Sequence, residues 1–307
     1  MATSFSQREV LVRQVKGKAD SFLRRTGVAI LAALCALAGP ANAADLEAKT
    51  ISAFDSYVQA TETQTASELA RREPLLWVEN LPADRRAAAE AQFRAGQVVI
   101  ERLDTLNDGS GGEHGKPIVV PDGMIHHWIG TVFIPGATLK QTLALEEDYN
   151  HHQDYFRPNV MRSKILRHDG NDFLIELRLR KKKIITTVLD TEHEVHYTLV
   201  DATHAWNRSR TTRIQEVDGA GERSERLLPV GHDQGFLWRM NTYWRFEEKD
   251  EGTYVECQSV SLTRDIPEGL GWLVGPFVTS IPRESLTFTL ASTRSAVLQR
   301  IGSHSRQ

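Results

Sequence analysis

The chain has 307 residues, of which 40% are hydrophobic and 25% charged, and its formal net charge is -3. These values are typical of an ordinary soluble globular protein with one or two domains. A balance so close to neutral gives no general electrostatic reason to bind nucleic acid, and we predict no nucleic-acid partner. One dense basic run, Arg178–Lys183, favours a solvated strand end over a phosphate-binding patch.

The N-terminal 43 residues have the composition of a signal peptide. Arg24 and Arg25 supply positive charge, and the apolar stretch Gly27–Gly39 that follows is too short to span a membrane. Small residues precede Ala44, which places the predicted cleavage site between Ala43 and Ala44. We therefore expect an exported protein, periplasmic or secreted, with no transmembrane helix after cleavage.

Cysteine and histidine patterns argue against several kinds of site. Cys35 would leave with the signal peptide, so Cys257 has no partner and the core must be held by packing alone. His193 and His196 would point to opposite faces of a strand, and we predict no metal site. The sequence contains neither a Walker motif nor Gly-x-Gly-x-x-Gly after a strand, so we predict no cofactor.

An N-terminal section, residues 44–122, is mostly helical in pattern. Apolar residues at helical spacing predict one helix over Asp45–Arg72. Strong helix formers predict a second helix over Pro82–Arg94, followed by a strand over Gln97–Leu103 and a loop over Asn107–Gly112. The section is either a small subdomain or an arm packed on the main body.

After this section the pattern changes to strands. A first strand over Met124–Ile134 is followed by two short helices, Ala137–Asp148 and Tyr149–Arg157. Turn residues at 169–171 and at 248–252 predict two hairpins. The pattern predicts six further strands: Val160–Arg167, Asp172–Leu189, His193–Val200, Ala205–Val217, Phe236–Glu247 and Thr253–Arg264.

Two of these strands alternate most clearly between apolar and polar residues. In one of them, Phe173, Ile175, Leu177 and Leu179 share a face. In the other, an apolar and aromatic face opposes a mostly polar one, and its predicted members are Phe236, Trp238, Met240, Thr242, Trp244 and Phe246. This pattern is typical of half-buried antiparallel strands.

An apolar run, Ile266–Pro282, leads into the last predicted helix, Pro282–Arg300. We place Pro282 in the first turn, where the N–H that proline lacks would be unpaired anyway. The helix carries one apolar stripe, made of Leu286, Leu290, Thr293, Val297 and Ile301. A helix of this kind, laid across a curved sheet, would cover the apolar faces of the strands.

The order of these elements resembles the START-like helix-grip superfamily (SRPBCC), which includes polyketide cyclase-like and lipid-transfer proteins. Short segments are similar to an uncharacterised group of exported bacterial proteins of this type: Gly123–Gly130, Gly235–Arg239 and Ile281–Leu286. The resemblance implies an α+β helix-grip fold, in which a curved antiparallel sheet of about six or seven strands wraps on the long C-terminal helix. The predicted organisation is a signal peptide (1–43), the helical section (44–122) and the START-like domain (123–307).

The resemblance also implies an elongated cavity between the sheet and the last helix, which holds apolar ligands in many relatives. The candidates for its lining are Trp128, Leu177, Leu179, Trp206, Trp238, Met240, Trp244, Phe246, Trp272, Phe277, Leu286 and Leu290. For any single aromatic side chain, filling of the core is the alternative. Arg264 and Arg283 are candidates for binding an anionic head group, with a structural ion pair at the helix entry as the alternative.

We expect a binding or carrier protein whose partner is an apolar small molecule or lipid. The alternatives are a cyclase- or hydrolase-like enzyme on the same scaffold and an envelope interaction protein whose core is filled by side chains. An enzyme would need an acid–base pair in the cavity, for which the sequence offers no motif. A packed core together with a large exposed apolar patch would favour the interaction protein.

Overall fold

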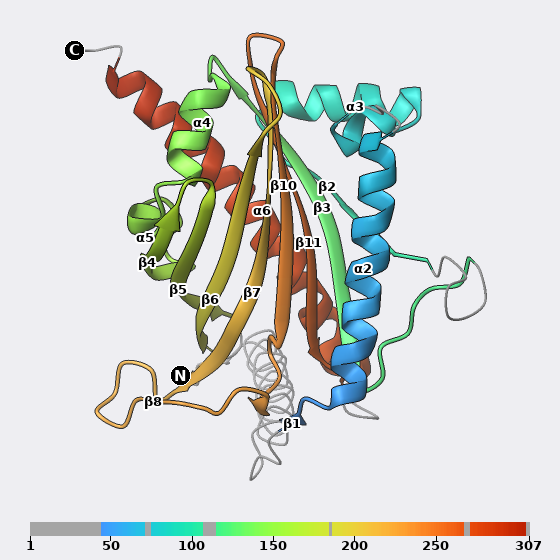
Figure 1. The fold of residues 1–307 in the computed structure, drawn as a ribbon, viewed down its shortest axis with the longest axis vertical. Helices are drawn as coiled ribbons and strands as arrows, with labels where there is room; N and C mark the ends of the chain where they lie inside the picture. The colour runs from blue at the N-terminus through green and yellow to red at the C-terminus, as the bar shows by residue number, and fades with distance from the viewer. Residues whose placement is uncertain (1–43, 71–74, 107–114, 184–185, 267–270, 305–307) are drawn as a thin grey trace, which may run out of the picture. The chain divides into compact units, whose positions relative to one another are not determined.

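A nine-stranded antiparallel sheet is the main feature of the computed structural model, which describes residues 44–70, 75–106, 115–183, 186–266 and 271–304 (Figure 1). Eight strands pair in the order β2-β3-β11-β10-β7-β6-β5-β4, and β8 pairs with β7. The bounds are β2 (Val99–Arg102), β3 (Gly123–Pro135), β4 (Val160–Asp169), β5 (Asp172–Lys182), β6 (Thr186–Leu199), β7 (His204–Asp218), β8 (Arg226–Leu227), β10 (Arg239–Lys249) and β11 (Gly252–Arg264). A separate small sheet joins β1 (Ala44–Asp45) to β9 (His232–Asp233).

The described helices are α2 (Ala48–Ala70), η1 (Trp77–Asn80), α3 (Ala83–Arg94), α4 (Leu139–Glu146), η2 (Tyr149–His151), α5 (His152–Tyr155) and α6 (Gly271–His304). The predicted α+β helix-grip fold is confirmed. The sheet has more strands than predicted because β2, from the N-terminal section, and the short β8 join it. The predicted signal peptide and the predicted loop over 107–112 lie outside the described residues.

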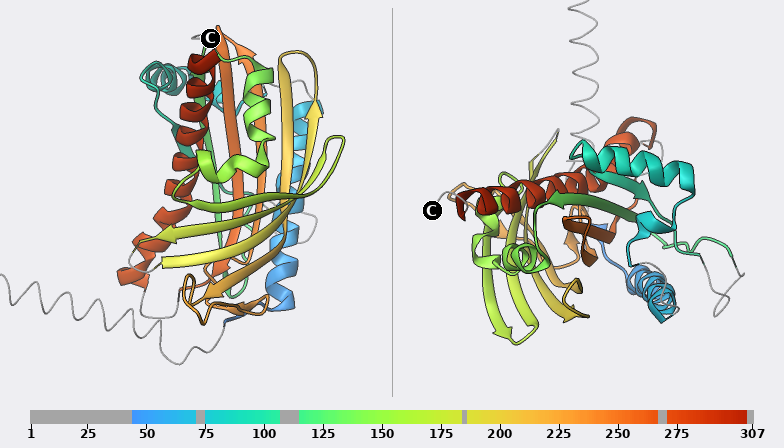
Figure 2. Two further views of the ribbon diagram at one scale, coloured as in Figure 1. Left: turned by 90° about the vertical axis from the view of Figure 1, so that its left-hand side faces the viewer. Right: turned by 90° about the horizontal axis from the view of Figure 1, so that it is seen from above.

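Helix α6 lies across one face of the sheet and packs on β3 and β11 (Figure 2). Its predicted apolar stripe is confirmed by the burial of Leu286, Leu290, Thr293 and Val297. Helix α6 approaches β3 closely at Gly130, where an added Cβ atom would lie 2.8 Å from Leu290 Cδ1. We call this side of the sheet the α6 face.

The last helix begins earlier than predicted. Because α6 starts at Gly271, Pro282 lies inside the helix instead of in its first turn. Proline has no N–H to donate to the Val278 carbonyl, so this helical hydrogen bond is missing. The predicted start was wrong because proline only prefers the first turn of a helix and does not require it.

Helix α2 packs on the opposite face of the same part of the sheet (Figure 1), and α3 joins a core cluster with Phe133 and Tyr254. Phe54 and Tyr57 of α2 join a core cluster with Val260 and Leu262 of β11. Buried polar contacts add to this packing, because His127 Nδ1 lies 2.9 Å from the Tyr57 hydroxyl oxygen. The section is therefore packed on the sheet, which was one of the two predicted arrangements.

Strand β11 is covered on both faces, by α6 on one side and by the N-terminal section on the other. Its buried residues include Glu256, which accepts hydrogen bonds from Arg245 and Thr131 at 3.0 and 2.9 Å. Glu256 also accepts the backbone N–H of Trp77 at 2.9 Å. These contacts fasten η1 to the sheet.

The structure has a hairpin of β5 and β6 where a single strand was predicted. The predicted strand Asp172–Leu189 is wrong, because β5 ends at Lys182 and β6 begins at Thr186. Asp190, predicted to lie between two strands, is inside β6 and accepts a hydrogen bond from Arg178 Nε at 2.6 Å. A charged residue is stable within a strand when its cross-strand neighbour carries the opposite charge.

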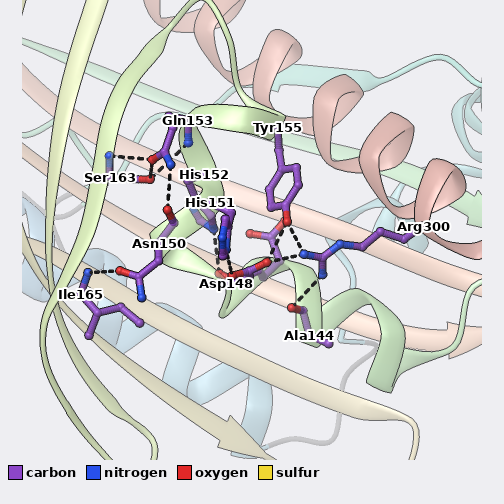
Figure 3. Close-up of polar contacts among 11 residues, drawn as sticks. Ala144, Asp148, Asn150, His151, His152, Gln153, Tyr155, Ser163, Ile165 and Arg300 are labelled. Carbon is purple, nitrogen blue, oxygen red and sulfur yellow. Dashed lines mark hydrogen bonds and ion pairs between the residues drawn. The ribbon is translucent and has the colours of Figure 1, made fainter.

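The turn formed by α4, η2 and α5 is tied to both α6 and β4 (Figure 3). Arg300 of α6 donates hydrogen bonds to the Asp148 carboxylate and the Tyr155 hydroxyl. The Gln153 side chain accepts the backbone N–H of Ser163 in β4 at 3.0 Å. The turn is thus held between the last helix and the edge strand, over the α6 face of β5 and β6.

Candidate functional site

Strand register determines which side chains share the α6 face. Cross-strand pairs put Tyr197, Asn207, Trp244 and Cys257 in one row across β6, β7, β10 and β11. The next row consists of Val195, Ser209, Thr242, Ser259 and Trp128. Three small polar side chains therefore lie next to one another in the middle of the face, with tryptophans beside them.

Part of the apolar surface on the α6 face is not covered by other side chains. Phe246, Leu286 and Leu290 are buried. In contrast, the candidates that keep exposed surface on this face are Trp128, Leu177, Leu179, Met240 and Trp244. A face filled to the density of a protein interior would bury all of these side chains alike. The half-buried members therefore keep apolar surface that a ligand can contact.

Two predicted lining residues lie on the opposite side of the sheet. Trp206 pairs with Arg245, whose guanidinium lies on the side of η1 and α2. Trp238 belongs to the core cluster under α2. The prediction for Trp238 was wrong because it extended the alternation upstream of the strand, which begins at Arg239, and Phe236 is 41% exposed.

The remaining candidates are not part of these rows. Arg264 donates to the Gln234 carbonyl at 3.2 Å, and Arg283 is exposed on α6. Within the described residues neither arginine forms an ion pair. Trp272 and Phe277 lie in α6, in the part of the helix whose side chains are outside the described structure.

Asn207 is a candidate that sequence reasoning missed. Its side chain is only 3% exposed, and its Oδ1 atom has no hydrogen-bond partner among the described residues. A buried carbonyl oxygen without a partner is costly, so such an atom indicates a place that water or a ligand completes. A sequence signal exists, because Asn207, Ser209 and Thr211 are polar at three successive alternate positions of β7, between the apolar Ala205 and Ile214.

A buried carboxyl group from α4 lies over the same row. Glu146 is 4% exposed and accepts a hydrogen bond from the Thr293 hydroxyl of α6 at 2.9 Å. Burial raises the pKa of Glu146 to about 7. Burial also raises the pKa of Tyr197 and that of Cys257, and the Glu146 charge adds to both shifts. These two residues stand at opposite ends of the row, so the Glu146 charge acts on both ends of it.

The histidines are separated by the sheet as predicted. His193 is buried on the α6 face, with Nε2 2.9 Å from the Thr191 hydroxyl oxygen. His196 lies on the other face, with Nδ1 2.8 Å from the Asp172 carboxylate. In the part of the chain that the structure describes, no group of three or more His, Cys, Asp or Glu side chains could hold a metal ion.

Acid is expected to destabilise the protein through its buried histidines. Burial lowers the pKa of His126, His127, His152 and His193 from 6.5 to about 4. Between these values the unfolded chain binds protons that the folded chain does not bind. The stabilisation that the buried neutral histidines give to the folded protein is therefore complete above pH 6.5 and is lost as the pH falls towards 4. We expect each of these histidines to lower the free energy of unfolding by about 2 kcal/mol when the pH falls from 7 to 5.

Urea unfolding at pH 7 and pH 5 measures this effect. Replacement His193→Gln should reduce the pH dependence by about 2 kcal/mol. Burial raises the pKa values of Glu146 and Glu216 to about 7, so these two groups increase the free energy of unfolding as the pH falls from 7 to 5. Their contribution is the same in every variant, so it does not affect the comparison between variants. An unchanged pH dependence in His193→Gln would contradict the prediction.

A surface hollow of about 300 Å³ lies on the side of the sheet away from α6. It is lined by the polar residues Arg167, Asp172, Glu194, His196, Arg208 and Arg210, together with Phe173 and Val195. Two of these, Arg208 and Arg210, also lie 3.6 and 3.8 Å from the Glu62 carboxylate of α2. Paired charges of both signs do not suit an apolar ligand, so the α6 face remains the candidate site.

The strand order, the covering by α6 and the apolar surface beneath it define an α+β protein with a helix-grip fold. No protein-family model matches the chain, and no curated protein matches it. Within the described residues, no helix combines the length and the apolar composition that crossing a bilayer requires.

Several solved structures are similar to this chain. Human STARD10 has 9% identity and a TM-score of 0.42, over 74% of this chain and 84% of that protein. The Zhui aromatase/cyclase from Streptomyces sp. R1128 has 12% identity and a TM-score of 0.41, over 58% and 96%. A STAR-related lipid transfer protein from Xanthomonas axonopodis has 16% identity and a TM-score of 0.37, over 58% and 95%. Such distant similarity leaves function to be inferred from the residues of this chain.

Proposed function

We propose that this protein binds an apolar small molecule or lipid on the α6 face, between the sheet and the last helix. The observation that carries the proposal is the half-buried apolar surface of Trp128, Trp244 and Leu177, which lies beside a fully buried core. Covering about 300 Å² of apolar ligand surface would contribute on the order of 7 kcal/mol before the costs of association. The net affinity would then be moderate, which suits a carrier that releases its ligand.

Lysine substitutions on the two sides of β5 test this proposal. Leu177 faces α6, whereas Leu174 of the same strand faces the other way. Leu177→Lys should weaken binding of the neutral apolar dye Nile red at least about tenfold, because an apolar ligand would cover the introduced charge. The matched variant Leu174→Lys should change the dissociation constant less than about twofold, since its charge stays in water.

Dye fluorescence titrations give the dissociation constants, and circular dichroism shows whether both variants are folded. Equal binding by the two lysine variants would place the dye elsewhere and contradict the proposed site. A wild-type protein that binds neither the dye nor any co-purifying apolar molecule would contradict the function itself.

We propose in addition that the chain is exported and that the segment before Ala44 is removed. The composition of residues 1–43 supports this proposal. Native mass spectrometry of the protein isolated from a bacterial envelope fraction would test export and binding together. The protein mass should correspond to a chain that starts at Ala44. A bound ligand should appear as a second species whose mass is larger by the mass of the ligand. A full-length mass in the cytoplasmic fraction would contradict export.

A further inference from the structure

The unpartnered amide of Asn207 specifies what kind of ligand the α6 face would take, given the proposed binding function. The side chain is 3% exposed, and Oδ1 is a buried acceptor to which no described residue donates a hydrogen bond. Its position follows from the register, because Asn207 stands between Tyr197 and Trp244 on this face. A buried acceptor of this kind is stabilised by a donor, which a water molecule or a bound ligand can supply.

The neighbouring side chains already use their donors elsewhere. The Tyr197 hydroxyl pairs with the Tyr149 hydroxyl at 2.8 Å. The Trp244 indole N–H donates to the Thr242 hydroxyl at 3.2 Å. These contacts leave Asn207 Oδ1 without a protein donor, although aromatic groups stand on both sides of it.

The charges around this position disfavour an anionic group. The Glu146 charge acts on Tyr197 and Cys257 at the two ends of this row, and it would repel a carboxylate or phosphate placed there. His193, farther along the face, is held neutral by burial. The cationic Lys181 pairs with Thr187 on β6, ten residues from Tyr197, or roughly 33 Å along the strand. The position near Asn207 therefore has no positive charge from these groups to bind an anion.

We propose that Asn207 anchors the ligand by accepting a hydrogen bond from a hydroxyl group, and that the ligand is an uncharged, otherwise apolar alcohol. The hydroxyl supplies the donor that Oδ1 lacks. The apolar remainder covers the exposed surface of Trp244 and of the aliphatic side chains on β5. An anionic lipid or fatty acid offers no donor when ionised and is disfavoured by Glu146.

Three probes of equal chain length distinguish the possible head groups: dodecan-1-ol, its methyl ether and dodecanoate. Each would displace Nile red from the wild-type protein at pH 7.5. The alcohol donates a hydrogen bond, the ether only accepts one, and the carboxylate carries a charge. We expect the alcohol to bind at least about tenfold more tightly than the other two.

Replacement Asn207→Leu should remove this preference to within about twofold while Nile red still binds. The same variant should unfold about 2–4 °C higher without ligand, because it removes an unpaired buried amide. A matched control is Asn241→Leu, since Asn241 is also buried, at 4%, but lies on the opposite face beside Tyr243. It should keep the preference for the alcohol. Asn207→Ala provides a second variant if leucine does not fit.

The outcomes separate the two proposals. If the ether or dodecanoate displaces Nile red as well as the alcohol does, the anchoring role of Asn207 is wrong although the protein binds apolar molecules. The same conclusion follows if Asn207→Leu and Asn207→Ala both retain the full preference. If Nile red itself does not bind the wild-type protein, the proposed function fails.

Discussion

Replacement of Glu256 by alanine is expected to lower the free energy of unfolding by about 3–5 kcal/mol. The carboxylate is fully buried and lies 3.0 Å from Arg245 Nη1, and the Arg245 side chain is 9% exposed. Without its partner, the guanidinium would remain buried with a full charge and no opposing one. The variant would also lose the hydrogen bonds that Glu256 accepts from Trp77 and Thr131, each at 2.9 Å.

Urea denaturation followed by circular dichroism would measure this loss. Glu101→Ala removes an exposed carboxylate that pairs with Arg85 and should change stability by less than about 1 kcal/mol. The double variant Glu256→Leu with Arg245→Met should recover most of the loss, because it removes both charges and keeps the volume. A cost below about 1 kcal/mol for Glu256→Ala would show that the carboxylate is not the counter-charge that holds Arg245.

Replacement of Leu290 by alanine is expected to cost about 2–5 kcal/mol. Leu290 is fully buried in the cluster that joins α6 to the sheet, together with Val132 and Val255. Removal of its side chain would leave a cavity between rigid elements that cannot close it. Leu298→Ala, which alters a half-buried leucine of the same helix, should cost less.

The contact between Leu290 and Gly130 allows a sharper test. Gly130→Ala alone should cost about 1–3 kcal/mol, because its Cβ atom would overlap the Leu290 side chain. In the Leu290→Ala background the overlapping atoms are absent, so the same replacement should cost at least about 1 kcal/mol less. Strict additivity of the two costs would mean that α6 does not approach β3 as closely as described.

Much of the fold follows from local patterns that the sequence itself displays. The sequence pattern placed Phe173 and Leu177 on one face of a strand and Leu290 in the apolar stripe of the last helix. Both placements match the structure. The predicted turns at 169–171 and 248–252 are confirmed, with Gly170, for example, at a φ of 58°. These features depend on neighbours within one strand, helix or turn. For this reason they can be predicted without knowledge of the partners.

The tertiary structure was needed to show which side chains line the candidate site. A period of two shows that Trp206 and Arg208 share a face of β7, but only pairing with β10 shows that this face lies away from α6. The register likewise placed Asn207 inward, where no residue in the described ranges donates a hydrogen bond to its side-chain oxygen. Local sequence thus determined which residues face the same way. Strands and helices distant in sequence decided what they face, because burial and hydrogen bonding are set by those distant partners.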